Sequence, residues 1–417
     1  MSGGKANVAT TVATRKKATL GRVAIWALIA FAVVALPVLC EGFQQFSFLT
    51  RIFGVVGLYV LLALGLNIVV GYAGLLDLGY IAFYGIGAYS GVIVGVAALK
   101  YLPVWLQPFQ YFLMIPVAAL AAGLAGVALG TPVLRLRGDY LAIVTLGFGE
   151  IVRILITNNI FGMTNGAAGL PRATETLAKP AGLLWLQNHL YVSIPNLGGP
   201  DGFTFSFSSN LYWYYIIVLL CLFAIFVILR LDNSRLGRSW AALREDEIAA
   251  SSMGISITKT KLWAFSLGAV WGGIAGVTFA NYQQFVTPES FSFMESVFVV
   301  AIVVIGGMAS IPGVILGAIF IQGVPELIRG FAQSGILSQI IHYNIPPETI
   351  TAITNYRNLI FGLFMIVMMI WRPQGMIPST RRAAELQPQN DETAVLESEQ
   401  LYDAQHDDAE PSGKNQF

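Results

Sequence analysis

Three charged residues lie inside or beside long apolar stretches, where a charge is costly to keep. Asp77 follows two leucines in the run 74–79, and Glu150 and Arg153 stand three residues apart in a largely apolar segment. A spacing of three places Glu150 and Arg153 on one face of a helix, where they can pair. Because a charge facing hydrocarbon costs roughly 2.5–3.5 kcal/mol at mid-depth, such residues should face the protein interior or water. They are candidates for a polar path or gate, and a structural ion pair is an equal alternative for Glu150 with Arg153.

Side chains suited to catalysis or metal binding are scarce and scattered. His189, His342 and His406 lie far apart in polar segments, and Cys40 and Cys221 both lie in apolar runs. This distribution predicts no metal site, no cofactor and no disulfide framework. No stretch has the GxxxxGKS/T pattern of a phosphate-binding loop, and no nucleophile is paired with a base. The chain is therefore predicted not to be an enzyme, and any ATP hydrolysis must come from another chain.

Composition places the chain in a membrane. Of its 417 residues, 56% are hydrophobic and 11% are charged. Soluble domains carry about 25% charged residues. A soluble chain of this length exposes a large surface to water and needs more charged residues to cover it. Lipid is therefore predicted to be the main solvent. The net charge of +1 implies no nucleic-acid-binding surface.

Ten apolar segments approach the length that crosses a bilayer, whose hydrocarbon core of about 30 Å needs about 20 helical residues. They lie near residues 22–40, 53–72, 78–98, 109–134, 139–158, 211–231, 260–281, 293–310, 312–330 and 355–371. The predicted fold is therefore all-α, a polytopic membrane helix bundle of about ten transmembrane helices. The first segment also resembles a signal sequence, but its length favours an uncleaved helix. The short break at 306–312 could contain half-helices or a re-entrant hairpin.

Basic residues predict how these segments are oriented, because cytoplasmic loops carry an excess of Lys and Arg. With the N-terminus in the cytoplasm, every basic cluster falls on the cytoplasmic side of an even number of crossings. This predicts a cytoplasmic arm at 1–21 and a transmembrane domain at 22–378, with an outer loop at 159–210 and a cytoplasmic loop at 232–258. The acidic segment 379–417 is predicted to be a disordered cytoplasmic tail.

Glycines at helical spacing predict close contacts between helices. Gly87, Gly91 and Gly95 recur every four residues, and so do three glycines at 268, 272 and 276. Lipid gives helices no hydrophobic reason to associate, so small residues that allow close backbone approach must supply the attraction. Separately, the run 68–74 resembles the run 302–307, which indicates either an internal repeat or a chance likeness of glycine-rich helix ends.

The cytoplasmic loop contains a segment, residues 239–254, that is too short and too polar to span a membrane. It has strong helix formers, a glycine after its end, and Trp240, Leu243 and Ile248 near one face. Four consecutive charged residues, 244–247, interrupt it. Anionic lipid would repel its acidic cluster, which argues against a helix lying on headgroups. The pattern favours a short coupling helix presented to a cytoplasmic protein partner.

The end of this segment resembles a motif of ABC importer permeases. Ala249 and Ala250 are followed after three residues by Gly254, and Glu247 stands close before them. The usual form of this cytoplasmic coupling motif has Glu directly before the two alanines, whereas Ile248 intervenes here.

Longer strings resemble one family closely. The string GRSWAALREDEIA at 237–249 is similar to the LivM-type permease subunits of branched-chain amino acid ABC transporters. Strings at 65–71, 134–153, 286–291, 301–308 and 369–375 resemble the same family, so that the resemblance covers roughly residues 53–378 in order. The N-terminal arm, the outer loop around 175–210 and the acidic tail lie outside it.

The resemblance implies an importer subunit for Leu, Ile or Val in a prokaryotic plasma membrane. Its implied partners are a second permease subunit of the LivH type, two cytoplasmic ATPase subunits and an extracytoplasmic solute-binding protein. The implied ATPase-coupling residues are Arg244, Glu245, Asp246, Glu247, Ala249, Ala250 and Gly254. Asn67, in the string 65–71, joins Asp77, Glu150 and Arg153 as a candidate for the translocation path.

Two other functions stay open at this point. A relative in the same superfamily could carry urea, amides or other amino acids, because the binding protein does much of the selection. A secondary transporter could instead use Asp77 or Glu150 as the carboxylate that couples transport to Na⁺ or H⁺. Uptake driven by an ion gradient through this chain alone would distinguish that class.

Overall fold

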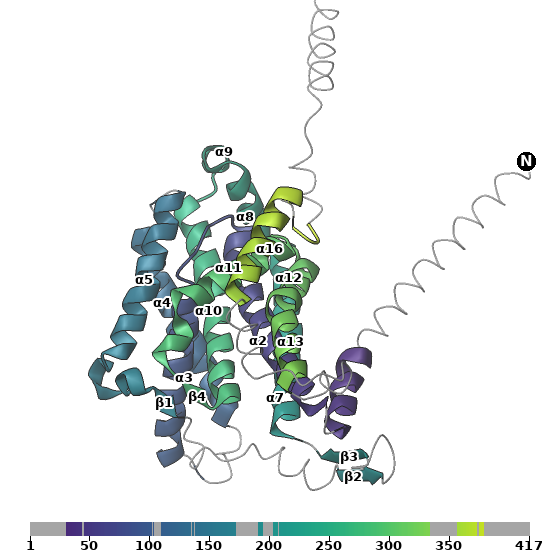
Figure 1. Cartoon of the computed structure of the whole chain (residues 1–417). Helices are drawn as coiled ribbons and strands as arrows, with labels where there is room; N and C mark the ends of the chain where they lie inside the picture. The colour runs from purple at the N-terminus through teal and green to yellow at the C-terminus, as the bar shows by residue number, and fades with distance from the viewer. Residues whose placement is uncertain are drawn as a thin grey trace, which may run out of the picture.

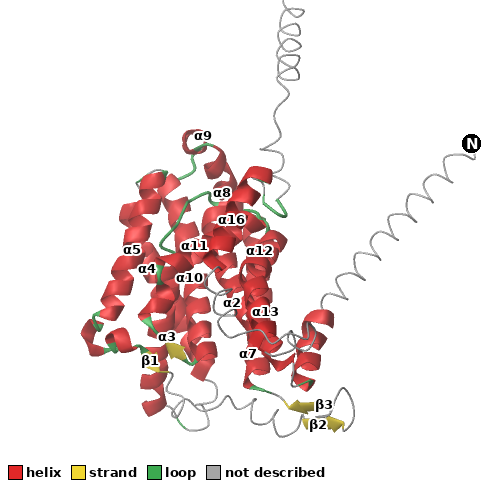
Figure 2. Ribbon diagram, in the orientation of Figure 1, coloured by secondary structure: helices red, strands yellow, loops and turns green. Residues whose placement is uncertain are grey.

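The computed structural model describes residues 31–43, 46–101, 103, 110–134, 136, 138–171, 191–194, 203–206, 208–333, 357–372 and 375–378. This part of the chain is mostly helical, as predicted, and two short two-stranded ribbons accompany the helices (Figures 1 and 2). The predicted N-terminal arm 1–21 and acidic tail 379–417 lie outside the described residues.

The helices follow the predicted apolar segments in order. After the helix Phe31–Gly42 come α2 (Ser47–Asn67) with the π-helical η2 (Ile68–Tyr72), α3 (Ile81–Tyr101), α4 (Gln110–Val133), α5 (Asp139–Thr157) and α7 (Ser209–Asp232). They are followed by α8 (Arg235–Glu245), α9 (Glu247–Ser252), α10 (Ile257–Gln283), α11 (Phe293–Gly306), α12 (Ile311–Ala318) with the π-helical η7 (Ile319–Gly323), α13 (Val324–Gln333) and α16 (Arg357–Trp371). Each predicted apolar segment thus contains described helix.

Six of the described helices are long and apolar enough to cross a membrane. They cover Ser47–Tyr72, Gln110–Val133, Tyr140–Thr157, Ser209–Asp232, Ile257–Gln283 and Ile311–Phe331. Phe31–Gly42, Ile81–Ala97 and Phe293–Gly306 are apolar but shorter. The fifth predicted segment, which contains Glu150 and Arg153, is among the six.

Helix α10 lies at the centre of the bundle and packs against α2, α3 and α4. The predicted glycine stripes form these contacts. A Cβ at Gly87 would overlap the backbone of Gly273, and a Cβ at Gly276 would overlap the carbonyl oxygen of Tyr84. Gly268 likewise leaves room for Val69 of η2. The glycine spacing therefore serves backbone-to-backbone packing between α3 and α10, as the sequence predicts.

The break predicted at 306–312 is a tight chain reversal. Helix α11 ends at Gly306, Gly307 has a φ of 124°, and Ala309 has a φ of 58°. Ser310 then caps α12, with its Oγ accepting a hydrogen bond from Gly313 N at 3.2 Å. The backbones of Gly306 and Gly313 touch, so α11 and α12 diverge from a point of direct contact. The segment after the reversal is one helical stretch with a π-helical turn, rather than separate half-helices.

The two ends of the bundle differ. Helices α8 and α9 lie at one end, which we call the α9 end, and the ribbon formed by β2 (Tyr191–Ile194) and β3 (Phe203–Ser206) lies at the other (Figure 1). A second ribbon pairs β1 (Leu170–Pro171) with β4 (Phe285–Val286), in the register Leu170 to Val286. The segments predicted as cytoplasmic loop and outer loop are thus at opposite ends.

Candidate functional site

The predicted single coupling helix is two helices, and Asp246 separates them. Asp246 has an extended backbone (φ −153°, ψ 116°), and its Oδ1 accepts hydrogen bonds from Ile248 N at 2.7 Å and Ala249 N at 3.0 Å. An aspartate that binds the first amide groups of a helix is a strong N-cap. Asp246 therefore ends α8 and starts α9 in a new direction, which corrects the prediction of one continuous helix.

The inner face of α8 is anchored to the bundle by a buried tryptophan. Trp240 and Leu243 are both buried, as the amphipathic pattern predicts, and Trp240 Nε1 donates a hydrogen bond to Thr260 O at 3.0 Å. Ile248 was predicted on the same face, but it is 68% exposed because the chain turns at Asp246. The predicted position of Ile248 is therefore wrong.

Two charged residues of the segment 239–254, which we call the coupling segment, bind the bundle. Arg244 Nη1 donates a hydrogen bond to Gly71 O in η2 at 2.9 Å, and its aliphatic stem lies against Gly74, whose φ is +70°. Glu247 Oε1 lies 2.5 Å from Lys261 Nζ near the start of α10. Lys261 is only 2% exposed, and Glu247 supplies the opposite charge that a buried ammonium group needs. Arg244 and Glu247 thus connect α8 and α9 to two different transmembrane elements.

An apolar tip remains exposed on α9. Ile248 and Met253 are 68% and 85% exposed, and Ala249 and Gly254 beside them are exposed as well. We call these four residues the coupling tip. Ala250 is buried, and Glu245 is exposed at the end of α8. Large apolar side chains grouped on an exposed turn are typical of a protein contact.

Ile248 and Met253 are not among the coupling residues that the sequence predicts. The available signal was the position of Met253 directly before Gly254, whose φ of +83° ends the helix. A large apolar residue at the end of a helix of only six residues has little of its own helix to pack against. Such a residue is exposed unless another element covers it.

Asn67 and Asp77 are fully buried, and each leaves one polar atom without a hydrogen-bond partner. Asn67 Oδ1 accepts from Ala309 N at 2.9 Å, while its Nδ2 has no partner. Asp77 Oδ1 accepts from Gly79 N at 2.9 Å, while its Oδ2 has no partner. Unpaired buried polar atoms are uncommon in folded proteins. The two residues contact different elements, so the structure does not join them into one cluster.

The residues after η2 form an irregular segment, 73–80, held by side chains from distant helices. Thr145 Oγ1 of α5 accepts a hydrogen bond from Leu78 N at 3.1 Å. Ser296 Oγ of α11 donates to Leu78 O at 2.5 Å. Gly79 packs directly on the backbone of Thr145, where no Cβ would fit. Irregular backbone at membrane depth is tolerated only where protein groups satisfy it.

Glu150 and Arg153 form the ion pair that their spacing predicts. Arg153 Nε lies 3.0 Å from both carboxylate oxygens of Glu150, and Arg153 Nη2 contacts Oε1. The side chains are 40% and 32% exposed, so the pair lies on the flank of α5 rather than inside the chain. Helix α5 stands at the edge of the bundle (Figure 1). Its flank is therefore open to a neighbouring molecule.

Hydrogen bonds connect some of the predicted residues and leave others apart. Gly71 accepts from Arg244, and a Cβ at Gly71 would overlap both Asn67 Oδ1 and Ala309 N. The coupling segment, η2 and the Gly307–Ser310 reversal thus meet at one place. Glu150 and Arg153 belong to a separate site on α5. Among the described residues, no group of His, Cys, Asp or Glu is arranged to hold a metal ion.

Comparison with known proteins agrees with this architecture. Residues 48–369 match the family model described as the permease component of branched-chain amino acid transport systems. The chain is 42% identical over 369 residues to the high-affinity branched-chain amino acid transport system permease protein LivM of Escherichia coli, which covers 86% of this chain and 76% of that protein. The LivM protein of Salmonella typhimurium is 41% identical over 371 residues.

A second type of permease is more distantly similar. The LivH protein of Escherichia coli is 25% identical over 340 residues, which covers 80% of this chain and 96% of that protein. Because the family model matches most of the chain and the identity to LivM proteins exceeds 40%, this chain belongs to the family of branched-chain amino acid transport system permease components.

Proposed function

We propose that this chain is a permease subunit of an ATP-binding-cassette importer that moves branched-chain amino acids (Leu, Ile and Val) into the cell. The observation that carries the proposal is the 42% identity, over 86% of the chain, to a protein named for high-affinity branched-chain amino acid transport. The exposed coupling tip supports it, because an importer driven by separate ATPase subunits needs a contact for them at one end.

The proposed assembly contains a second permease subunit of the LivH type, two cytoplasmic ATPase subunits and an extracytoplasmic solute-binding protein. Similarity to both LivM and LivH proteins supports a pairing of two related permeases. In this proposal the α9 end faces the cytoplasm of a prokaryotic cell, about ten helices cross the plasma membrane, and both termini are cytoplasmic. The acidic segment 379–417 is then a cytoplasmic tail.

Reconstitution tests the proposal directly. We expect liposomes that contain this chain, its second permease and its ATPases to take up leucine under one condition only. ATP must be present on the side of the ATPases, inside the liposome, and the binding protein must be present outside. Radiolabelled leucine inside the liposomes measures uptake, and a non-hydrolysable ATP analogue serves as the control. Uptake by this chain alone, driven by a Na⁺ or H⁺ gradient, would instead establish an ion-coupled secondary transporter. ATP-driven uptake of urea or amides in place of leucine would correct the substrate.

The coupling residues divide into three roles in this proposal. Ile248 and Met253, with Ala249, Gly254 and Glu245, form the surface that contacts the ATPase. Asp246 and Ala250 shape the turn. Arg244 and Glu247 transmit its movement, because Arg244 binds η2 and Glu247 binds α10. A displacement of the tip is therefore passed to two transmembrane elements at once.

Changing the apolar tip should prevent ATPase binding. We expect Met253→Asp to lower co-purification of the ATPase subunits by at least about tenfold. A tenfold loss of affinity needs only about 1.4 kcal/mol, and burying an unpaired carboxylate in a contact costs more than that. Met163→Asp is the matched control, because Met163 is also more than half exposed but follows α5 near the opposite end. Equal ATPase recovery with both variants would remove the tip from the contact surface.

Breaking the ion pair between Glu247 and Lys261 should separate ATP hydrolysis from transport. We expect Lys261→Met to retain ATPase binding and hydrolysis while leucine uptake falls about tenfold, because the tip no longer moves α10. Lys259→Met, an exposed lysine two residues earlier on the same helix, is the control. The measurement is the number of ATP molecules hydrolysed per leucine transported. A ratio unchanged by Lys261→Met would show that the pair transmits nothing.

Asn67, Asp77, Glu150 and Arg153 are proposed to contribute to the translocation path in different ways. Glu150 and Arg153 are open on the flank of α5, where a second permease could complete a path between the subunits. An amino acid carries one ammonium and one carboxylate, so a carboxylate and a guanidinium side by side could bind both groups. Asn67 and Asp77 are buried, and they maintain the interruption between α2 and α3.

Removing one charge of the α5 pair distinguishes a path from a structural role. Glutamine has nearly the size of glutamate and keeps an oxygen that can accept a hydrogen bond from Arg153. Glu150→Gln should therefore leave the thermal unfolding temperature nearly unchanged. The transport efficiency, measured as Vmax/KM for leucine uptake, should fall about tenfold. Glu326→Gln, which removes the carboxylate of the similar pair with Arg329 on α13, is the control. Unchanged uptake with Glu150→Gln would exclude the pair from the path.

A further inference from the structure

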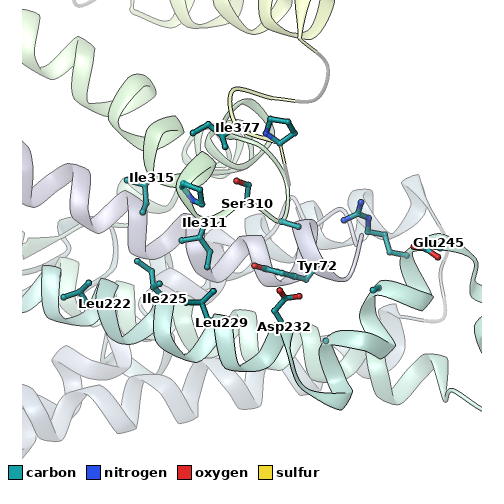
Figure 3. A pocket seen from close by; sticks show the side chains of 16 residues that line it. Tyr72, Leu222, Ile225, Leu229, Asp232, Glu245, Ser310, Ile311, Ile315 and Ile377 are labelled. Carbon is teal, nitrogen blue, oxygen red and sulfur yellow. The ribbon is translucent and has the colours of Figure 1, made fainter. Parts of the chain in front are cut away.

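A groove of about 680 Å³ runs along α7 at the α9 end, apart from the coupling tip and the α5 pair, and shares Arg244 and Glu245 with the coupling residues. Its wall on one side is α7 and α8, and on the other side it is the start of α12 with the segment 375–378 (Figure 3). Tyr72 of η2 closes it from within the bundle. The groove therefore lies between a peripheral helix and the core.

The lining of the groove is divided by chemical character along its length. Leu222, Ile225 and Leu229 project into it from α7, and Ile311 and Ile315 face them from α12 (Figure 3). Asp232, Arg244 and Glu245 line the other part, together with Ser310. One part is thus a continuous apolar trough, and the other carries both signs of charge.

The length of this trough corresponds to one leaflet of a bilayer. Leu222 and Asp232 are ten residues apart on one helix, which is about 15 Å at the helical rise of 1.5 Å per residue. Half of the hydrocarbon core is also about 15 Å thick. The charged part therefore lies at headgroup depth when the apolar part reaches the centre of the membrane.

The charges select among lipid headgroups. Guanidinium groups bind phosphate well, because they offer several N–H donors in one plane. Asp232 and Glu245 would repel a headgroup of purely negative charge, and they suit an ammonium group that can donate hydrogen bonds. A phosphoethanolamine headgroup carries one phosphate and one primary ammonium, so it complements Arg244 and the two carboxylates together.

We propose that this groove binds one phospholipid with a phosphoethanolamine headgroup, whose acyl chain lies along α7. The placement in the cytoplasmic leaflet rests on the proposed function, but binding itself does not. Because Arg244 also binds Gly71 of η2, the headgroup would contact the residue that joins α8 to the bundle. Lipid composition would then influence how firmly the coupling segment is held.

Native mass spectrometry of the detergent-purified transporter tests this site without relying on uptake. We expect one phosphatidylethanolamine to remain bound per copy of this chain, and Leu229→Trp to remove it by filling the trough. Leu219→Trp is the matched control, since Leu219 is exposed on α7 outside the groove (64%, against 49% for Leu229). Asp232→Asn should weaken retention several-fold. Phosphatidylcholine, whose ammonium has no N–H, should be retained at least several-fold less.

Three results would overturn the proposal. Loss of lipid from both Leu→Trp variants, or from neither, would show that the groove is not the binding place. Equal retention of phosphatidylethanolamine, phosphatidylcholine and phosphatidylglycerol would indicate unselective surrounding lipid. A photocrosslinker at position 229 that captures the second permease instead of lipid would show that a protein covers the groove. If ATP-driven uptake fails while lipid retention is normal, the proposed function is wrong and the lipid site stands.

Discussion

The structure depends on one constraint: backbone groups that leave a helix in apolar surroundings must still find hydrogen-bond partners. Helix α2 ends at η2 and is followed by eight non-helical or turn residues before α3. Unsatisfied amide or carbonyl groups in such a place cost several kcal/mol each. Thr145, Ser296 and Asp77 supply partners to this segment, and Arg244 supplies one to Gly71. Several buried polar side chains of this bundle, among them Asn67, Asp77 and Ser310, therefore lie where helices are interrupted.

This constraint also explains why the coupling segment is part of the bundle rather than an appendage. Arg244 satisfies a carbonyl of η2 while it fixes α8, and Glu247 neutralises a lysine that would otherwise be buried alone. Each interaction satisfies a buried carbonyl or charge. Each also links the coupling segment to a helix of the bundle. Removing the Arg244 or Glu247 side chain would leave the Gly71 carbonyl or the Lys261 ammonium without this partner, so losing either connection destabilises the bundle.

The sequence predicted most of the helices because hydrophobic length and basic loops are strong, local signals. It also predicted the contact of Glu150 with Arg153, since a spacing of three residues suffices. It could not predict that Asn67 binds Ala309, 242 residues away, or that Glu247 pairs with Lys261 on the next helix. Ile248 was placed on the wrong face because Asp246 can either continue a helix or cap the next one. In the structure the Asp246 side chain accepts hydrogen bonds from Ile248 N and Ala249 N, so it caps the next helix.

Helix α10 has 27 residues and no proline, so it extends about 40 Å without an interruption. One end holds Lys261 and Thr260, which bind the coupling segment, and the other end leads into β4, which pairs with β1. Inserting a single residue would rotate one end by about 100° relative to the other and shift it by about 1.5 Å. The number of residues in α10 is thus constrained, as are the identities of its buried glycines. Substitutions along its exposed face are compatible with this arrangement, whereas insertions and deletions would put its two ends out of register.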